Sequence, residues 1–174
     1  MSTLSKAEIL RLLRALDEEL RAQGATGEIY LVGGAVMALV FDARASTRDV
    51  DAFFRPVESI RVAAARVADT FACAPDWLND AVKGFMSERG TFDDYLELPN
   101  LRVLTAQPEY LLAMKCLSMR IGPEFHDEAD VRFLLRYLNV ESYERAVEII
   151  GRYYPKERFP AKSLYALEEI LAGV

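Results

Sequence analysis

The pattern of apolar and polar residues predicts helices alternating with short strands over the first two thirds of the chain, and helices alone after that. The run Ser5-Lys6-Ala7-Glu8 forms a capping box, and apolar residues then recur at helical spacing. A first helix is therefore expected from this box to about residue 23, just before Gly24. The short apolar run at 28–32 is typical of a buried strand.

The next segment predicts a glycine turn, a short helix and a second strand. Gly33 and Gly34 lie at the end of the first strand, and apolar residues after them fit a helix over 34–41. A polar loop over 43–48 leads into an apolar strand over 50–54. Proline lacks the N–H that a sheet needs, so Pro56 is expected to end this strand.

Further elements follow from the same patterns. Helical spacing predicts a helix over 57–71, and Pro75-Asp76 predicts a turn after it. Strands are expected around Phe85 and over 95–98 and 101–104, the last two joined at Pro99-Asn100. The remaining patterns predict helices over 108–121, 127–138, 142–153 and 160–171.

This order of elements predicts an α/β (α+β) fold. We expect an α/β core with a small mixed sheet over 1–107, and a helical part over 108–174 packed on the core as a single compact unit. A chain of 174 residues with 52 % hydrophobic and 28 % charged residues has the profile of a folded domain.

Composition also excludes several classes. The longest uncharged apolar stretch, 29–41, is shorter than the ~20 residues of a membrane span, and no basic-then-apolar leader opens the chain. Cys73 and Cys116 lie far apart and in no CxxC motif, so we expect reduced thiols in a cytoplasmic protein. The net charge of −6 argues against a broad nucleic-acid surface.

Asp49 and Asp51 have the clearest chemical role. A strand presents residues i and i+2 on one face, so both carboxylates are predicted to lie on one side of strand 50–54. Two neighbouring anions repel each other, and a divalent cation held by oxygen ligands relieves the repulsion. With one histidine and no Cys/His cluster, Mg²⁺ or Mn²⁺ is the expected ion. The alternative is a solvated strand edge.

Gly33 and Gly34 suit a phosphate site. Glycine lets the backbone approach a phosphate without an intervening side chain, and the helix that follows offers its positive end. Together with the paired aspartates, this turn predicts a site for a metal-bound triphosphate, although a plain strand-to-helix turn is the alternative. The chain has neither a GxGxxG motif nor a P-loop.

These motifs resemble the nucleotidyltransferase superfamily with the DNA polymerase β-type fold, in particular the small bacterial enzymes of toxin–antitoxin and abortive-infection systems. In that family Gly-Gly or Gly-Ser at a helix start precedes Asp-x-Asp on a strand, and the run Thr47-Arg48-Asp49-Val50-Asp51 matches well. The resemblance implies that the aspartates are catalytic and hold magnesium. It also implies that Gly33, Gly34, Thr47 and Arg48 bind the nucleotide.

A second part of the resemblance lies downstream. The family has a Leu-Leu-x-x-Lys helix before an Arg/Lys-Asp-x-x-Asp helix, and here Lys115 precedes Asp127 and Asp130, with His126 where a basic residue is usual. The resemblance gives Lys115 a role in catalysis and nucleotide binding, and the two aspartates a supporting role. From the residues alone, Lys115 reaches the edge of an apolar face, Asp127 caps a helix and Asp130 pairs with Arg120.

A third carboxylate completes the metal site in the resembling family. Glu97 is the candidate here, because alternation in strand 95–98 places it opposite apolar side chains. Asp93 and Asp94 are the alternatives, and an exposed strand glutamate is the other interpretation of Glu97.

The function that the resemblance implies is transfer of a nucleoside monophosphate from an NTP to a hydroxyl. The acceptors it suggests are an RNA such as a tRNA end, a protein or a small molecule. The biological setting it suggests is a toxin–antitoxin or phage-defence module, with an antitoxin or toxin as partner. One alternative is a nucleotide- or partner-binding module on the same fold without catalysis, and another is a purely structural α/β protein.

Overall fold

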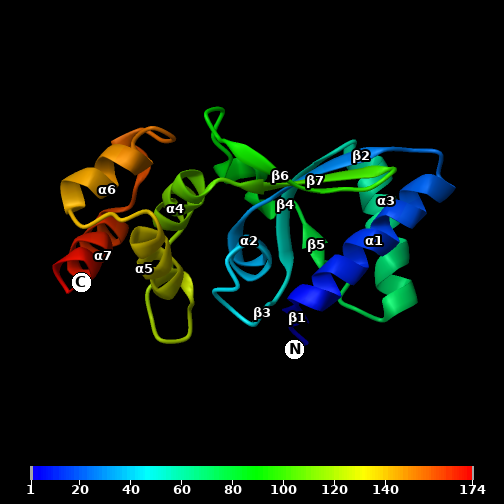
Figure 1. Ribbon diagram of the computed structural model, residues 1–174, viewed down its shortest axis with the longest axis horizontal. Helices are drawn as coiled ribbons and strands as arrows, with labels where there is room; N and C mark the ends of the chain where they lie inside the picture. Colours follow the sequence, from blue (N-terminus) through cyan, green and yellow to red (C-terminus); the bar gives the residue numbers. More distant parts are fainter. Residues whose placement is uncertain (1, 174) are drawn as a thin grey trace. The chain divides into compact units, whose positions relative to one another are not determined.

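The computed structural model describes residues 2–173, which form two compact units (Figure 1). One unit comprises the chain up to Gly84 together with Phe92–Ala106, and the other comprises Phe85–Thr91 with the chain from Gln107 onward. The first unit contains helices and a mixed sheet and the second is helical, so the fold is of the mixed α+β type. The predicted domains, 1–107 and 108–174, differ from these units in the placement of Phe85–Thr91 and of Gln107.

In the described part of the first unit, a five-stranded mixed sheet is the central element. β2 runs parallel to β7 and antiparallel to β4, while β5 runs parallel to β4 and β6 antiparallel to β7. The strands lie in the order β5 (Leu78–Asn79), β4 (Val50–Arg55), β2 (Gly27–Leu31), β7 (Leu101–Ala106) and β6 (Phe92–Glu97). The strands predicted over 28–32, 50–54, 95–98 and 101–104 are confirmed, with shifted ends.

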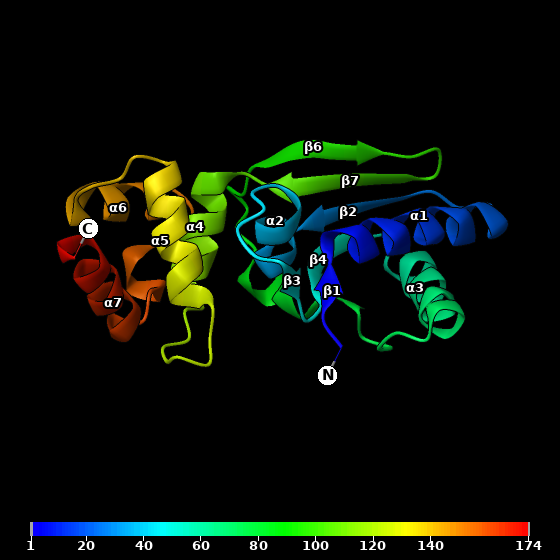
Figure 2. The ribbon, with the colours of Figure 1, turned by 60° about the horizontal axis from the view of Figure 1, so that its bottom comes forward.

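Helices α1 (Lys6–Ala22) and α3 (Val57–Phe71) lie side by side and pack against one face of this sheet (Figure 2). The capping box is confirmed, because the Ser5 hydroxyl accepts the Glu8 N–H and the Glu8 carboxylate accepts the Ser5 N–H. The sheet residues on this face are fully buried: Ile29, Leu31, Val50, Ala52 and Val103. Their burial fixes the strand register, since a slip by one residue would turn polar side chains into the core.

The opposite face of the sheet carries aromatic and charged side chains. Tyr30 packs against Phe53 with ring centroids 5.9 Å apart and against Phe92 at 5.0 Å. Arg55 lies over the Tyr30 ring at 5.6 Å. Because β4 alternates, Asp51 shares this face with Phe53 and Arg55.

Three short elements complete the first unit. Helix α2 (Gly33–Leu39) follows β2 directly, and β1 (Leu4–Ser5) pairs with β3 (Ser46–Thr47). The predicted loop 43–48 therefore contains a two-residue strand, and β5 lies within the predicted turn after Pro75. Strands of two residues are too short to leave a period-two pattern.

The predicted strand around Phe85 is wrong. The chain forms a 3₁₀ helix, η1 (Ala81–Phe85), and the Phe85 side chain is 46 % exposed. A strand needs several alternating residues, whereas Gly84 and Lys83 next to this phenylalanine supply no alternation.

The second unit consists of helices and the segment Phe85–Thr91. Four helices confirm the predicted ones, α4 (Pro108–Leu117), α5 (Asp127–Tyr137), α6 (Tyr143–Ile150) and α7 (Ala161–Ala172), but α4 and α6 end before the predicted residues 121 and 153. An additional 3₁₀ turn, η2, covers Lys156–Arg158. The Tyr154 hydroxyl donates to the Phe85 carbonyl, and the Tyr110 hydroxyl accepts the Ser87 N–H at 2.9 Å. These bonds join Phe85–Thr91 to the helices. Within residues 2–173, no helix combines the length and the apolar character that crossing a membrane requires.

Candidate functional site

The aspartate pair lies where β4 begins. Asp51 is the second residue of β4, and Asp49 precedes the strand by one residue; both side chains are half-buried. The N–H of Val32, which directly follows β2, donates to the Asp51 carbonyl at 3.0 Å. The sheet therefore holds the pair beside the turn that leads from β2 into α2.

The glycine turn lies directly against Asp51. Gly33 has φ +65°, which L side chains rarely adopt, and a Cβ there would lie 3.1 Å from Asp51 Oδ2. A Cβ on Gly34 would lie 2.6 Å from both Thr47 Oγ1 and Arg44 Nη1. The backbone of the turn thus fills the space between Asp51 on one side and a hydroxyl and a guanidinium on the other. Helix α2, which begins at this turn, has only seven residues.

Two residues of the loop before Asp49, Thr47 and Arg48, interact with Asp49. Thr47 is buried, and its hydroxyl donates to the Asp49 carbonyl at 3.3 Å. Arg48, by contrast, is exposed, and its charge acts on Asp49. Four of the five nucleotide-binding residues predicted from the sequence, Gly33, Gly34, Thr47 and Arg48, therefore lie around one pair of carboxylates.

The electrostatics of Asp49 favour added positive charge. Burial raises the pKa of Asp49, and the negative charge of Asp51 raises it further. The guanidinium of Arg48 acts in the opposite direction, Asp76 adds to the increase, and a hydrogen bond from Asn79 lowers it. Because the net shift is upward, an additional cation would stabilise the ionised pair.

Asn79 and Asp76 were not predicted as site residues. Asn79 lies on β5 opposite Asp51, and Asp76 belongs to the turn that leads into this strand. The only sequence signal is the pair Trp77-Leu78, whose apolar side chains are buried beside the polar Asn79. Two buried residues after a proline turn indicate an edge strand only weakly.

Glu97 does not reach the aspartate pair. Glu97 pairs with Arg102 in the β6–β7 hairpin. Arg102 pairs with Glu28 of β2, and Glu28 pairs with Arg55 of β4, so that Glu97 lies level with Arg55 across the sheet. Asp51 lies four residues before Arg55 on β4, and β4 lies three strands away from β6. Asp51 and Glu97 are therefore roughly 20 Å apart. The hairpin turn places Glu97 at the opposite end of the sheet, which alternation within one strand could not show.

The alternatives to Glu97 do not complete a metal site either. Asp94 forms an ion pair with Arg102 at 2.7 Å, and Asp93 is an exposed residue opposite Thr105. Among residues 2–173, no three His, Cys, Asp or Glu side chains are grouped so that they could hold one metal ion. The candidate metal ligands are therefore the two aspartates.

Lys115, Asp127 and Asp130 come together in the helical unit. The Lys115 ammonium is buried and lies 3.2 Å from Asp127 Oδ1 and 2.7 Å from Asp130 Oδ2. Asp127 also accepts the Arg120 N–H and Nε–H at 3.0 and 2.9 Å. Burial alone would raise the pKa of Asp127, but the hydrogen bonds from Arg120 and the charge of Lys115 hold that pKa below its ordinary value.

This cluster differs from what the residues alone suggested. Lys115 does not extend to the edge of the helix, and Asp127 is the first residue of α5 while His126 is its N-cap. Arg120 bonds Asp127, and Asp130 forms an ion pair with Lys115. The i, i+3 spacing of the two aspartates, which puts them on one helix face, was a signal for a shared partner. A role of Lys115 toward a triphosphate stays a prediction.

Comparison of the chain with protein-family models, with curated proteins and with solved structures gave no match, so its function is inferred from the residues described above.

Proposed function

We propose that this protein is a metal-dependent nucleotidyltransferase with the polymerase β-type fold, which transfers a nucleoside monophosphate from an NTP to a hydroxyl. The observation that supports this most strongly is the contact of the Gly33-Gly34 turn with Asp51 and Thr47, beside the second carboxylate of Asp49. A backbone turn without side chains next to paired carboxylates suits a triphosphate and its cation.

The donor set fits a divalent cation. Carboxylate oxygens are ligands that Mg²⁺ and Mn²⁺ prefer, and the raised pKa of Asp49 reflects a pair that favours added positive charge. Asp49 and Asp51 would hold the ion. When bound, the ion offsets the phosphate charge and lowers the pKa of the attacking hydroxyl.

The glycine turn and two arginine side chains hold the triphosphate. The backbone of Gly33 and Gly34 approaches the phosphates, and the guanidiniums of Arg44 and Arg48 bind their oxygens. The acceptor oxygen forms a bond to the α-phosphorus and its proton passes to solvent. The bond from the α-phosphorus to the bridging oxygen breaks, and pyrophosphate leaves with that electron pair.

The helical unit and the acceptor complete the proposal. We assign Lys115 and its aspartates a supporting role, because the cluster fixes α4 to α5. The net charge of −6 favours a protein or a small molecule over an RNA acceptor. A toxin–antitoxin or phage-defence setting, with a cognate partner, follows from the resemblance of the motifs.

A second candidate is a nucleotide-binding module without catalysis. It is favoured by the finding that, among the described residues, no third carboxylate joins Asp49 and Asp51. Such a module would bind a nucleotide with a cation but release no pyrophosphate with any acceptor.

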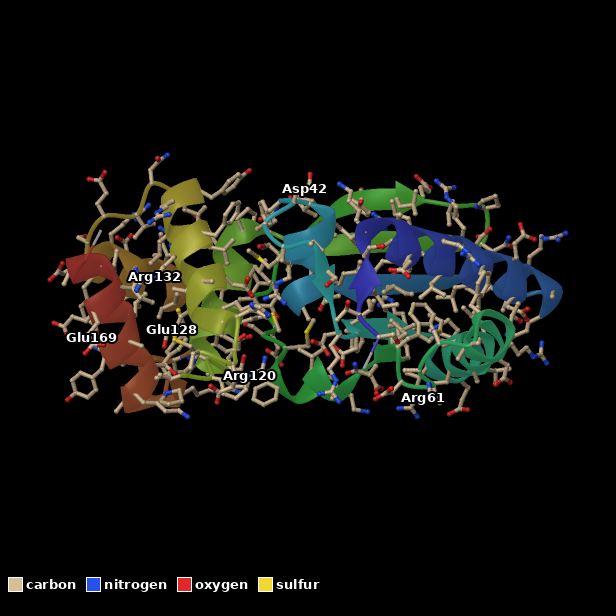
Figure 3. The ribbon with its side chains drawn as sticks, turned by 90° about the horizontal axis from the view of Figure 1, so that it is seen from below. Asp42, Arg61, Arg120, Glu128, Arg132 and Glu169 are labelled. Atoms are coloured by element: carbon tan, nitrogen blue, oxygen red, sulfur yellow. The ribbon has the colours of Figure 1, made fainter. Side chains whose placement is uncertain are left out.

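Calorimetric titration with ATP, CTP, GTP and UTP, with and without Mg²⁺, tests the proposal together with an assay for pyrophosphate. We expect Mg²⁺-dependent binding and turnover that Asp49→Asn abolishes. The matched control is Asp42→Asn, because Asp42 lies in the turn after α2 and pairs with Lys6 at 3.1 Å (Figure 3). Binding without pyrophosphate supports the module, and no Mg²⁺-dependent binding contradicts both.

A further inference from the structure

An exposed aromatic ring lies next to the aspartate pair on the open face of the sheet. Because β4 alternates, Asp51 and Phe53 share the face opposite the one that α1 and α3 cover. Phe53 follows Asp51 by two residues, which is about 6.6 Å along a strand. Phe53 is 36 % exposed, so a molecule bound at Asp51 can reach its ring.

Tyr30 holds the Phe53 ring in place. The two residues are paired across β2 and β4, and their ring centroids are 5.9 Å apart. Tyr30 is itself fixed, because its hydroxyl donates to Glu28 at 2.7 Å and its ring packs edge-on against Phe92 at 5.0 Å. Phe53 and Tyr30, called the ring pair below, therefore form an ordered surface that loses little freedom when it binds another ring.

The ring pair and the glycine turn lie on opposite sides of Asp51. Tyr30 pairs with Phe53, and the N–H of Val32 donates to the Asp51 carbonyl, so β2 runs from the ring pair past Asp51 into the turn. In phosphoryl transfer the attacking and leaving oxygens lie in line on opposite sides of the phosphorus. With the pyrophosphate at the glycine turn, the acceptor hydroxyl approaches from the side of the ring pair.

The arginines that border the ring pair are already compensated. Arg55 donates to Glu28 through Nε and Nη2 at 2.9 and 2.7 Å. Arg102 forms an ion pair with Asp94 at 2.7 Å. The phosphates of a nucleic-acid chain would have to compete with these carboxylates for the guanidiniums. The surroundings of the ring pair therefore favour an uncharged planar group.

We propose that the ring pair is the acceptor subsite and that the acceptor is a tyrosine side chain of a protein, stacked on Phe53 with its hydroxyl toward Asp51. This inference rests on the proposed function. Tyrosine carries the protein hydroxyl that is attached to an aromatic ring. Its pKa of about 10 lies below that of an alcohol, so its oxygen needs less help to lose the proton. This suits a site in which, within residues 2–173, no third carboxylate joins the aspartate pair.

The transfer step then has a defined product. The phenolic oxygen forms a bond to the α-phosphorus, and its proton passes to solvent. The bond from the α-phosphorus to the bridging oxygen breaks, and pyrophosphate leaves with that electron pair. The product carries a nucleoside monophosphate on the tyrosine oxygen.

The test uses the full chain with Mg²⁺, each of the four NTPs, and N-acetyl-L-tyrosinamide or N-acetyl-L-serinamide as acceptor. We expect pyrophosphate release with the tyrosine probe at least about tenfold faster than with the serine probe, because serine has no ring to stack. Mass spectrometry should show a tyrosine product heavier by one nucleoside monophosphate.

Substitutions at Phe53 test the subsite itself. Phe53→Leu should raise the KM for the tyrosine probe about two- to tenfold with little change in kcat, because stacking holds the acceptor before and during transfer. Phe53→Tyr keeps a ring and should restore the KM. The matched control is Phe71→Leu on α3, which covers the other face of the sheet; its KM should stay within about twofold of the wild type.

The outcomes separate this inference from the proposed function. Mg²⁺-dependent NTP binding without transfer to the tyrosine probe overturns the tyrosine acceptor and leaves the proposed function intact. Equal rates with the serine probe, transfer only to an RNA oligonucleotide, or an unchanged KM in Phe53→Leu overturn it in the same way. If no NTP binds in a Mg²⁺-dependent manner, both the proposed function and this inference are overturned.

Discussion

Asp49 is a half-buried carboxylate beside a second carboxylate, Asp51, and both burial and this neighbour raise its pKa. A carboxyl whose pKa is higher in the folded state than in the unfolded state binds more protons when folded. Its contribution to stability is therefore fully present below the unfolded pKa and is lost as pH rises through the folded pKa. At neutral pH, the ionised Asp49 lowers the stability of a fold that a bound cation would stabilise.

Asp49→Asn should consequently stabilise the protein while removing the proposed cation binding. We expect a higher Tm at pH 7, because the variant no longer keeps an ionised carboxylate half-buried beside Asp51. The difference should shrink as pH falls below 3.8, the ordinary pKa of this carboxyl, because Asp49 is then protonated in both states. Thermal melts by circular dichroism measure both effects. A lower Tm for Asp49→Asn at pH 7 would show that the ionised form is the stabilised one.

Gly33→Ala should affect both stability and binding. The positive φ alone costs about 1–2 kcal/mol for a residue with a Cβ, and the Cβ would lie 3.1 Å from Asp51 Oδ2. Gly24→Ala is a matched control: Gly24 also has φ +65°, but among the described atoms none lies within 4 Å of its Cβ position. Urea denaturation and Mg²⁺–NTP titration separate the effects. Both variants should lose stability, and only Gly33→Ala should lose affinity; equal affinities would contradict a role for the turn.

For single residues, the sequence predicted that the glycine pair and the aspartate pair lie together, but not which residues surround them. The glycine pair and the aspartate pair are close in sequence, so the local pattern of strand, turn and helix brings them together. Asn79, Asp76 and Arg44 could not be predicted, because their positions depend on β5 and on the close approach of the loop to Gly34. Glu97 was misplaced because strand alternation gives a face and not a position along the sheet.

Among the elements, those with a long repeating pattern were predicted well. Helix α3 begins and ends as expected, and the capping box of α1 is present. β1, β3 and β5 were missed, because a two-residue strand exists only through its pairing partner. The buried Trp77 shows what holds such a strand in place, since its ring packs into the first unit where the turn after α3 returns to the sheet.

Trp77→Ala tests whether this anchor sustains β5. Removing a fully buried tryptophan side chain should cost about 3–5 kcal/mol in the free energy of unfolding. Trp77→Phe keeps most of the ring volume but loses the hydrogen bond to the Ala64 carbonyl, which should cost about 1–3 kcal/mol. Urea denaturation followed by circular dichroism gives both values. A loss below about 1 kcal/mol for Trp77→Ala would mean that the ring is not an anchor.

Lys115 joins α4 to α5, and its removal should be costly. Lys115→Met leaves two buried carboxylates without the ammonium between them, which should cost about 3–5 kcal/mol. Lys83→Met is the control, because Lys83 is an exposed residue whose ion pair with Asp80 should contribute at most about 1 kcal/mol. Chemical denaturation of both variants measures the difference. Similar values for the two would contradict the structural role of the buried cluster.

For the whole molecule, the division into a mixed α/β part and a helical part followed from the order of the predicted elements. The strand order β5-β4-β2-β7-β6 did not, because it includes the parallel pairing of β2 with β7, whose partners are distant in sequence. For the same reason, the assignment of Phe85–Thr91 to the helical unit depends on bonds to Tyr110 and Tyr154 that no local pattern shows. With a net charge of −6, the chain offers a cation an attractive overall field.

The central claim, that Asp49 and Asp51 share a cation which in turn binds a nucleotide, is tested most directly by anomalous scattering from Mn²⁺ in crystals grown with a nucleoside triphosphate. We predict an anomalous peak within about 2.0–2.4 Å of carboxylate oxygens from both aspartates, with the triphosphate against the Gly33-Gly34 turn. A nucleotide and a peak found elsewhere on the protein, with the aspartate pair empty, would contradict it.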